Sequence, residues 1–196
     1  MNRPFAAAGI ALTAIALTAA PALAHTGVGE TSSFMAGLGH PVGGLDHILA
    51  MVAVGLWAAL KGGKAIWLWP CVFVGVMVAG GALGMAGIEL PLVEPGILAS
   101  IVVLGLLVAI AANLPLAAGA AIVGVFALAH GHAHGSEAPE AGTALLYGLG
   151  FALATAALHA AGIGLAMFSR EAVWRTVVRA VGAGLAVAGV ALSFGA

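Results

Sequence analysis

The chain has 196 residues, of which 63% are hydrophobic and only 7% are charged, and its mean hydropathy is +1.18. A soluble domain carries about a quarter charged residues, so this composition excludes an ordinary soluble enzyme and predicts an integral membrane protein. A formal net charge of -1 without a basic run excludes a nucleic-acid-binding surface, and a single cysteine, Cys71, excludes an intramolecular disulfide.

The first 24 residues have the pattern of a secretory signal peptide. Arg3 precedes an apolar stretch from Phe5 to Ala20, and small residues at Ala22 and Ala24 form a cleavage site. An uncleaved membrane span is the alternative, and the short apolar core disfavours it. Cleavage after Ala24 would make His25 the mature N-terminus. Its α-amine and imidazole could then bind a metal ion, although a solvated tail residue explains His25 equally well.

Residues 25–196 are predicted to form one all-α domain, a polytopic transmembrane helical bundle. A membrane-spanning helix needs about 20 apolar residues. Six stretches meet this need, at approximately 42–60, 65–85, 92–112, 115–131, 143–168 and 173–194. Glycine and alanine are abundant in them, and small residues let helices approach closely in lipid. We therefore expect six tightly packed spans after removal of the signal peptide.

Charge predicts the orientation of these spans, because Lys and Arg in short loops stay on the cytoplasmic side. If the mature N-terminus is outside, the inward loops and the start of the last span contain Lys61, Lys64, Arg170, Arg175 and Arg179. The outward loops contain Glu89, Glu94, Glu137 and Glu140, together with both histidine-rich segments. We therefore expect a multi-pass protein of a bacterial-type inner membrane, with both mature termini on the periplasmic side.

The first histidine-rich segment contains His40, Asp46 and His47. The Pro-Val-Gly-Gly sequence between them disfavours a continuous helix, so we expect a break that lets His40 fold back toward the other two. Adjacent residues on a regular helix diverge by about 100°, so Asp46 is either a direct metal ligand or the group that orients the imidazole of His47. The alternative is that the histidines lie at the membrane interface and Asp46 caps a helix.

The second segment contains His130, His132, His134 and Glu137. On a continuing helix His130 and His134 share a face and Glu137 follows on it, while His132 points elsewhere and is only an additional candidate. The alternative is a solvated histidine-rich loop that binds metal without purpose. Because both segments fall on the outer face, their convergence favours a metal site.

A further histidine, His159, lies inside an apolar helix between Leu158 and Ala160. It is either a buried neutral histidine bonded to a neighbouring helix or a relay site on the inward path of an ion. Imidazoles with a few carboxylates suit Ni, Co, Zn or Cu(II), whereas a cage of oxygen ligands would suit Mg or Ca.

These residues resemble the HupE/UreJ family of nickel and cobalt permeases. The resemblance rests on His40-x5-Asp46-His47 in the first mature span and on His130-Gly-x-Ala-His134-Gly-x-Glu137 in the fourth, and it extends in outline over the whole chain. It implies uptake of Ni²⁺, with Co²⁺ as the alternative, for hydrogenase or urease maturation. It also implies that six residues are needed for transport: His40, Asp46, His47, His130, His134 and Glu137. The resemblance does not cover His25 or His132.

The sequence therefore predicts a permease and not an enzyme. It contains no Walker-type Gly-x4-Gly-Lys-Ser/Thr motif, so passive or ion-coupled permeation is expected. The ion is the cargo, no prosthetic group is expected, and the expected partners are the divalent ion and the lipid bilayer, with a homo-oligomer left open. Two alternatives are a metal-binding accessory or sensor protein without transport, and a haem-binding electron carrier. The second is disfavoured because haem needs two histidines at matching depth and only His159 lies deep.

Overall fold

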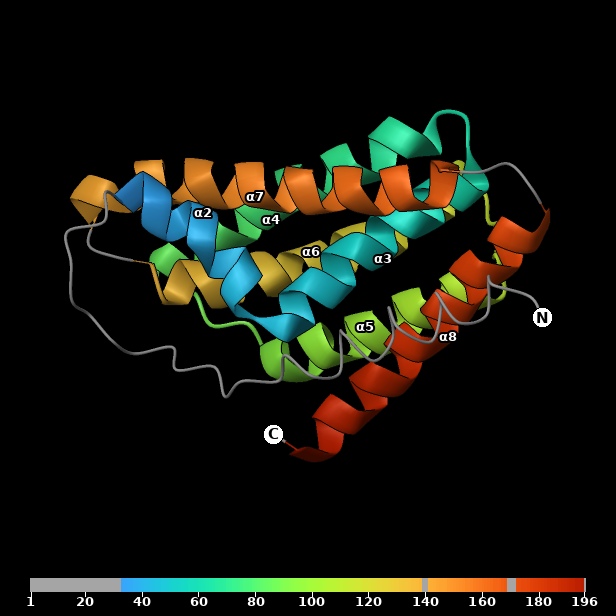
Figure 1. Ribbon diagram of the computed structural model, residues 1–196. Coiled ribbons are helices and arrows are strands. Elements are labelled where there is room, and N and C mark those ends of the chain that lie inside the picture. Colours follow the sequence, from blue (N-terminus) through green and yellow to red (C-terminus); the bar gives the residue numbers. More distant parts are fainter. Residues whose placement is uncertain (1–32, 139–140, 169–171, 196) are drawn as a thin grey trace.

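The computed structural model describes residues 33–138, 141–168 and 172–195. These residues form helices and no strand, which confirms the predicted all-α class (Figure 1). The helices are α2 (Ser33–Gly43), α3 (Leu45–Lys61), α4 (Ala65–Met85), α5 (Val93–Ala109), α6 (Leu116–Ser136), α7 (Ala141–Met167) and α8 (Ala172–Gly195). The predicted signal peptide at residues 1–24 and the candidate ligand His25 lie outside the described residues.

Among the described residues, four segments are long and apolar enough to cross a membrane: α4, α6, residues Thr143–Met167 of α7 and residues Ala172–Phe194 of α8. Helices α2 and α3 together have the composition of one further span, but they are bent by 81° at the break between them. Helix α5 has 17 residues, which corresponds to about 26 Å against a hydrocarbon thickness of about 30 Å. The helices therefore support a multi-pass membrane protein.

The span expected at residues 42–60 corresponds to helix α3, and a further helix, α2, precedes it. The expected break in the Pro-Val-Gly-Gly sequence occurs at its last residue, Gly44, whose backbone is extended with φ −105° and ψ 121°. Pro41 lies inside α2, so His40 is helical. A Cβ atom at Gly44 would lie 2.7 Å from Oδ1 of Asp46, so a larger residue here would push this carboxylate from its position beside His47. The missing N–H of Pro41 weakens the last turn of α2 and favours the break that follows.

The expected third span, 92–112, is longer than the observed helix α5. Leu92 precedes the helix with φ 60° and Ala111 follows it with φ 50°. The left-handed region of the backbone does not continue a right-handed helix, so both residues end it. At the C-terminal end Ala111 N donates to Val108 O at 2.9 Å and Ala112 N donates to Leu107 O at 2.9 Å. These two bonds form a Schellman motif, which satisfies carbonyl groups of the last turn.

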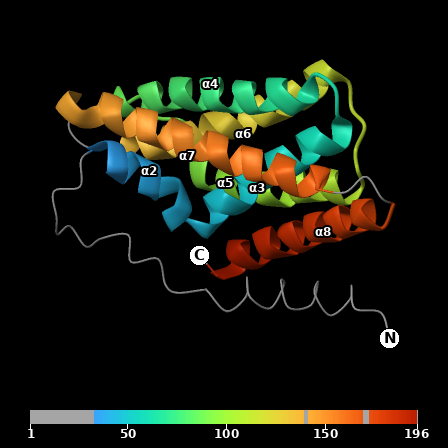
Figure 2. The same cartoon turned by 45° about the horizontal axis from the view of Figure 1, so that its top comes forward.

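The bundle is built around four helix pairings. Helix α7 lies along both α2 and α3, so it bridges the break in the first span (Figure 1). Helix α4 packs against α6, and α5 packs against α8. Helices α4 and α8 lie on opposite sides of the bundle (Figure 2). The two helices on either side of the break at Gly44 are therefore held by one continuous partner.

Glycines at the pairings bring the backbones close together. In the pairing of α4 with α6, a Cβ atom on Gly131 would lie 2.8 Å from Cα of Met77. A Cβ atom on Gly84 would lie 2.7 Å from the backbone nitrogen of Ser136. Real Cβ atoms do not approach backbone atoms this closely, so side chains at these positions would separate the helices. This packing fixes how far α6 extends along α4, and α6 carries the second histidine-rich segment.

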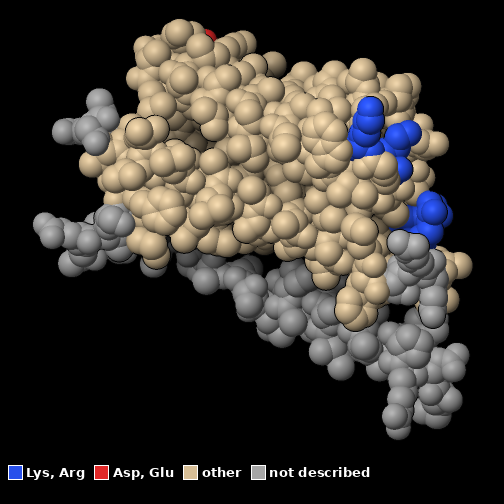
Figure 3. All heavy atoms as spheres, turned by 90° about the horizontal axis from the view of Figure 1, so that it is seen from above, with Lys and Arg blue, Asp and Glu red and all other residues tan. Residues whose placement is uncertain are grey.

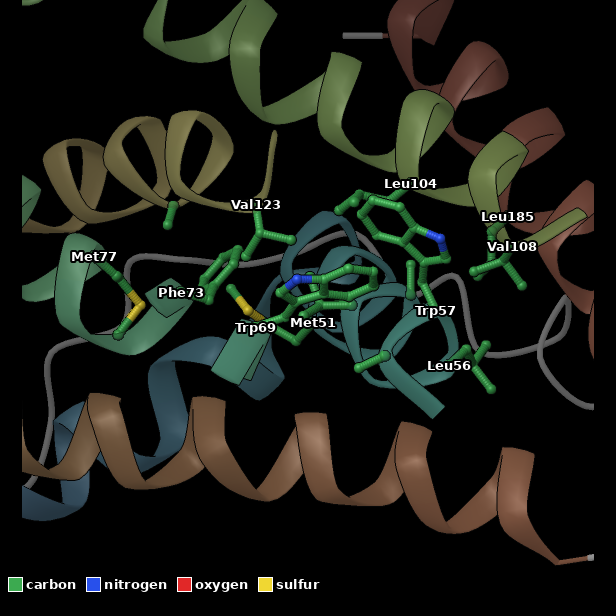
Figure 4. Packing of buried hydrophobic residues seen from close by; sticks show 14 of the residues in the cluster. Met51, Leu56, Trp57, Trp69, Phe73, Met77, Leu104, Val108, Val123 and Leu185 are labelled. Carbon is green, nitrogen blue, oxygen red and sulfur yellow. The ribbon is translucent and has the colours of Figure 1, made fainter. Parts of the chain in front are cut away.

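The apolar core occupies the middle and one end of the bundle. Met77, Phe73 and Trp69 follow one another along α4, and Trp57 of α3 lies beside Trp69 (Figure 4). The two indole rings are 4.2 Å apart between centroids, and both side chains are fully buried. Their N–H groups donate to the carbonyl oxygens of Ala112 and Leu116, at 2.9 Å and 3.0 Å. The tryptophan pair therefore closes the bundle beside the α5–α6 connection.

The described basic residues gather at the same end as this connection. Figure 3 shows Lys and Arg at one end of the face it presents. Lys61 Nζ donates to Oδ1 of Asn113, and Arg179 Nε donates to Ala109 O at 2.7 Å. These contacts fix the end of α3 and the first turns of α8 beside the end of α5. We call this the basic end of the molecule, and the opposite end, which holds the ends of α4 and α6, the histidine end.

Candidate metal site

A cavity of about 420 Å³ opens at the histidine end of the bundle. Its lining comes from α2, α3, α5 and α6, and from the break between the first two of these helices. It includes both histidine-rich segments: His40, Gly43, Gly44, Asp46, His47, Glu94, Ile97, Ala133, His134 and Glu137. The break at Gly44 therefore brings residues on either side of it to one cavity.

His40 is positioned by the last turn of α2. Its ring meets the ring of His134 edge-on, with 4.6 Å between centroids, and it also lies 5.8 Å from Tyr147 and 6.0 Å from Phe151 of α7. Its Nε2 atom lies 3.7 Å from Oε2 of Glu137. His40 is thus held between α6 and α7, and its nitrogen faces a carboxylate.

His47 is oriented by the residue before it. Asp46 Oδ1 accepts from the backbone N–H of His47 at 2.9 Å and lies 2.9 Å from its Nδ1. A carboxylate accepts protons, so neutral His47 carries its proton on Nδ1 and a lone pair on Nε2. That Nε2 faces Nε2 of His134. An Asp that fixes the tautomer of a ligating imidazole is a common arrangement around metal ions.

The facing nitrogens of His47 and His134 have a chemical consequence. Since His47 offers a lone pair there, the two nitrogens need a proton or a cation between them. A proton on Nε2 of His134 fulfils this role and leaves the lone pair on its Nδ1, which is buried and has no hydrogen-bond partner among the described residues. A metal ion fulfils the same role with both rings as ligands.

His130 is also fixed in one tautomer. Its Nε2 lies 3.0 Å from Oγ of Ser100, and this hydroxyl donates its only proton to Ile97 O at 2.6 Å. The hydroxyl therefore accepts from Nε2–H, and the lone pair of His130 is on Nδ1. This atom is buried and has no partner among the described residues. The ring of His130 packs edge-on against His47, with 4.7 Å between centroids.

One ligand atom from each of His40, His134 and Glu137 lies within 4.8 Å of the others. Bonds of about 2.1 Å to a first-row metal ion hold three ligand atoms roughly 3.0–3.6 Å from one another. Each of the three side chains would therefore move inward by up to about 0.7 Å to hold one ion. The three residues come from two segments that are far apart in the sequence. They meet here because α2 and α6 are both fixed against neighbouring helices.

The cluster lies deeper in the bundle than the end of α6 suggests. Phe151, which contacts the rings of His40 and His134, follows the first residue of α7 by ten positions. Ten helical residues correspond to about 15 Å along the axis. Helices α2 and α7 therefore extend past the cluster and place it in a recess.

The remaining candidates lie outside this cluster. His132 is on the other side of α6, where its Nε2 is 2.7 Å from Ile88 O in the turn after α4. His159 is 1% exposed and lies further along α7, against the ring of Phe73. The expectation that His132 points away from the other two histidines of α6 thus agrees with the structure.

Sequence reasoning missed several residues of the site. Glu94 in the first turn of α5 lines the cavity and makes no hydrogen bond or ion pair with the described residues. The sequence placed Glu94 only in an acidic outward turn. Its position on the same outer side as the histidine-rich segments was the signal that could have identified it. Ser100, Phe151 and Tyr147 lie within apolar stretches of the sequence, so only the packing of α5 and α7 reveals them.

Comparison with known proteins agrees with this geometry. A family model described as HupE / UreJ protein matches residues 13–192, which include both histidine-rich segments. The chain is also 48% identical over 184 residues to Protein HupE from Rhizobium leguminosarum bv. viciae, covering 93% of this chain and 96% of that protein. No solved structure matches the chain. The chain therefore belongs to the HupE/UreJ family.

Proposed function

We propose that this protein is a permease that takes up a divalent transition-metal ion across the inner membrane, with Ni²⁺ as the main cargo and Co²⁺ as the second. One observation carries the proposal: His40, His134 and Glu137 converge to within 4.8 Å in a recessed cavity of a multi-pass helical protein. Imidazoles with a carboxylate are the ligands that late first-row metal ions prefer. Membership of the HupE/UreJ family supports the same cargo.

The cavity suits the capture of a hydrated cation. Six water molecules occupy about 180 Å³ at roughly 30 Å³ each, so a hydrated ion fits into 420 Å³ before it loses water. Asp46, Glu94 and Glu137 are among the residues that line it, and its described lining contains no Lys or Arg. Carboxylates around a recess raise the local concentration of cations. The imidazoles then replace part of the water around the ion.

The distribution of charge supports uptake from the periplasm. The described Lys and Arg residues lie at the basic end, and Lys and Arg of short loops stay in the cytoplasm. The cavity opens at the other end. In our proposal the chain has six spans, with α2 and α3 forming one broken span and α5 a short one, and the mature chain begins after Ala24 with both termini in the periplasm.

Transport by the purified chain in proteoliposomes tests the function. We expect radioactive nickel to accumulate inside the vesicles, with Co²⁺ competing better than Zn²⁺ or Cu²⁺. Nickel that stays bound to the protein without entering the lumen would contradict the permease and favour a metal-binding accessory role. Accumulation that no other metal inhibits would limit the cargo to nickel.

Substitution of the cluster residues tests the site. His47→Ala and His134→Ala each remove one imidazole, so we expect uptake to fall at least tenfold, which corresponds to about 1.4 kcal/mol or more. His132→Ala is the matched control, because it removes an imidazole of α6 that does not line the cavity. Unchanged saturable uptake in the two cluster variants would refute the assignment of the site, even if the protein transports nickel.

A further inference from the structure

His159 is a buried histidine whose side chain makes no hydrogen bond with the described residues. Its side chain is 1% exposed, and neither Nδ1 nor Nε2 has a partner among the described residues. A neutral imidazole has one donor and one acceptor, and buried polar atoms are almost always paired. A histidine that only filled space in the core would be worse than leucine. The ring therefore needs an explanation other than packing.

The neighbours of His159 connect it to the metal cluster. The ring of Phe73 meets His159 edge-on, with 5.0 Å between centroids, and the same ring lies 5.7 Å from His130. His130 in turn packs against His47 in the cavity wall. One phenyl ring thus contacts the last imidazole of the outer cluster and the inner imidazole. Nδ1 of His130 and both nitrogens of His159 are unpaired near this ring.

The helices place these residues in order along the bundle. On α7, Phe151, Thr155 and His159 recur every four residues on one buried face. Phe151 contacts His134, so His159 lies about 12 Å further toward the basic end. On α6, His130 lies one turn closer to the basic end than His134. The imidazoles therefore form a series from the cavity into the core.

Two weak metal ligands lie near His159, and the tryptophan pair closes the space on the side of the basic end. Thr155 Oγ1 donates to Sδ of Met77 at 3.7 Å, and Met77 and Thr155 lie one turn from Phe73 and His159 on their own helices. Trp69 lies one turn from Phe73 toward the basic end, and it stacks on Trp57. The series of imidazoles thus ends directly above the fully buried tryptophan pair.

We propose that His159 is an inner binding station for the metal ion, which the ion reaches from Nδ1 of His130 when the Phe73 ring rotates. The proposal rests on the function proposed above. The station combines one nitrogen of His159 with the hydroxyl of Thr155 and the thioether of Met77, and Nδ1 of His130 is a further imidazole nitrogen. The hydroxyl and the thioether are weak ligands, so the station releases an ion readily. Conduction requires such binding, strong enough for the ion to enter and weak enough for it to leave. The ion leaves the station when the tryptophan pair separates.

Two variants test this station separately from the outer site. His159→Leu fills the same apolar space without a ligand. We expect its calorimetric affinity for Ni²⁺ to stay within about twofold of the unaltered protein, because the outer cluster is intact, whereas accumulation of nickel in proteoliposomes falls at least tenfold. His159→Cys offers a softer ligand, so we expect it to shift the preference for transported metal from Ni²⁺ toward Cd²⁺. A residue with a purely structural role would not change this preference.

His132→Leu is the matched control, because it is the same substitution at a histidine outside the series, and its uptake should be unchanged. Normal nickel uptake by His159→Leu would overturn the station but leave the permease in place. Equal loss of binding and uptake would indicate a structural role and also overturn it. If His159→Leu does not fold, His159→Cys decides, and an unchanged metal preference refutes the station. No accumulation by the unaltered protein would contradict the permease itself.

Discussion

The two ends of the bundle use polar groups in opposite ways. At the histidine end and along the series below it, buried side-chain atoms of His130, His134, Tyr147 and His159 have no hydrogen-bond partner among the described residues. At the basic end, the indole N–H groups of both core tryptophans are bonded to carbonyl oxygens. Lys61 and Arg179 also bind groups of the α5–α6 region. The histidine end thus leaves some of its buried polar atoms available for a ligand, whereas these groups of the basic end are all bonded within the fold.

This difference separates the residues that serve a ligand from those that serve stability. Buried unpaired polar atoms cost about 1–3 kcal/mol each, so a fold retains them only where another role compensates. In this protein they follow the line from the cavity to His159. Substitutions at the histidine end should therefore change metal binding most, and substitutions at the basic end should change stability alone.

The largest effect is expected from Gly131→Ala, which breaks the histidine end. Gly131 lies between His130 and His134, and an added Cβ atom would collide with the backbone of Met77. Backbone cannot rotate aside as a side chain can, so α6 must move away from α4. We expect the thermal unfolding temperature in detergent to fall, in keeping with overpacking costs of about 1–3 kcal/mol, and nickel uptake to fall at least tenfold.

Gly124→Ala is the control on the same helix face. Its Cβ atom would meet only side chains of α4, at 3.7 Å from Val72 Cγ1 and 3.8 Å from Val76 Cγ2. These are ordinary contacts, and alanine favours a helix over glycine. Uptake and unfolding temperature should therefore be retained or slightly raised. If Gly131→Ala behaves like Gly124→Ala, the close approach of α4 and α6 does not position the imidazoles.

A smaller effect is expected from Asp46→Asn, which keeps the shape of the side chain and removes its charge. The amide holds the proton on Nδ1 of His47 less firmly, so the lone pair on Nε2 is offered less consistently. Groups that orient a ligating histidine typically account for a 10–100-fold change in metal affinity, or about 1.4–2.7 kcal/mol. Calorimetric titration of Ni²⁺ into the purified protein measures this change.

Loss of one negative charge must be separated from loss of orientation. Glu89 is exposed in the turn after α4 and does not line the cavity, so Glu89→Gln removes the same charge at the same end of the molecule. We expect it to change the affinity by less than about threefold, and to lose that effect at high salt. Equal weakening by both substitutions would mean that Asp46 acts only through net charge.

The sequence predicted the ligand types better than it predicted the backbone that presents them. Helical spacing placed His130, His134 and Glu137 on one face and His132 on another, because a helix with no Pro or Gly-Gly break keeps its period. It also suggested that Asp46 orients His47. These relations are local, so they depend little on the rest of the fold. Whether these residues bind metal stays a prediction.

The break in the first span shows which features the sequence alone could not predict. The Pro-Val-Gly-Gly sequence was expected to break the helix, and the chain does break within it, but α2 continues through Pro41 and the chain turns only at Gly44. Packing decides which of the four residues turns, because α2 is paired with α7. The packing of α5 against α3 and α6 likewise brings Glu94 to the cavity. Such contacts join segments far apart in sequence, so no spacing rule could have predicted them.

The smallest effect is expected at the basic end, from Ala111→Gly. Helices α4 and α5 end in the same Schellman motif, but α4 has Gly87 at the left-handed position with φ 70°, whereas α5 has Ala111 with φ 50°. An alanine in this region is strained by about 1 kcal/mol, so glycine should stabilise the protein by about 0.5–1 kcal/mol. Gly87→Ala should destabilise it by a similar amount. Because Ala111 lies beside the tryptophan pair and far from the cavity, thermal unfolding should change while nickel affinity stays constant. A changed affinity in Ala111→Gly would show that the basic end influences the outer site, and the separation of the two ends would then be wrong.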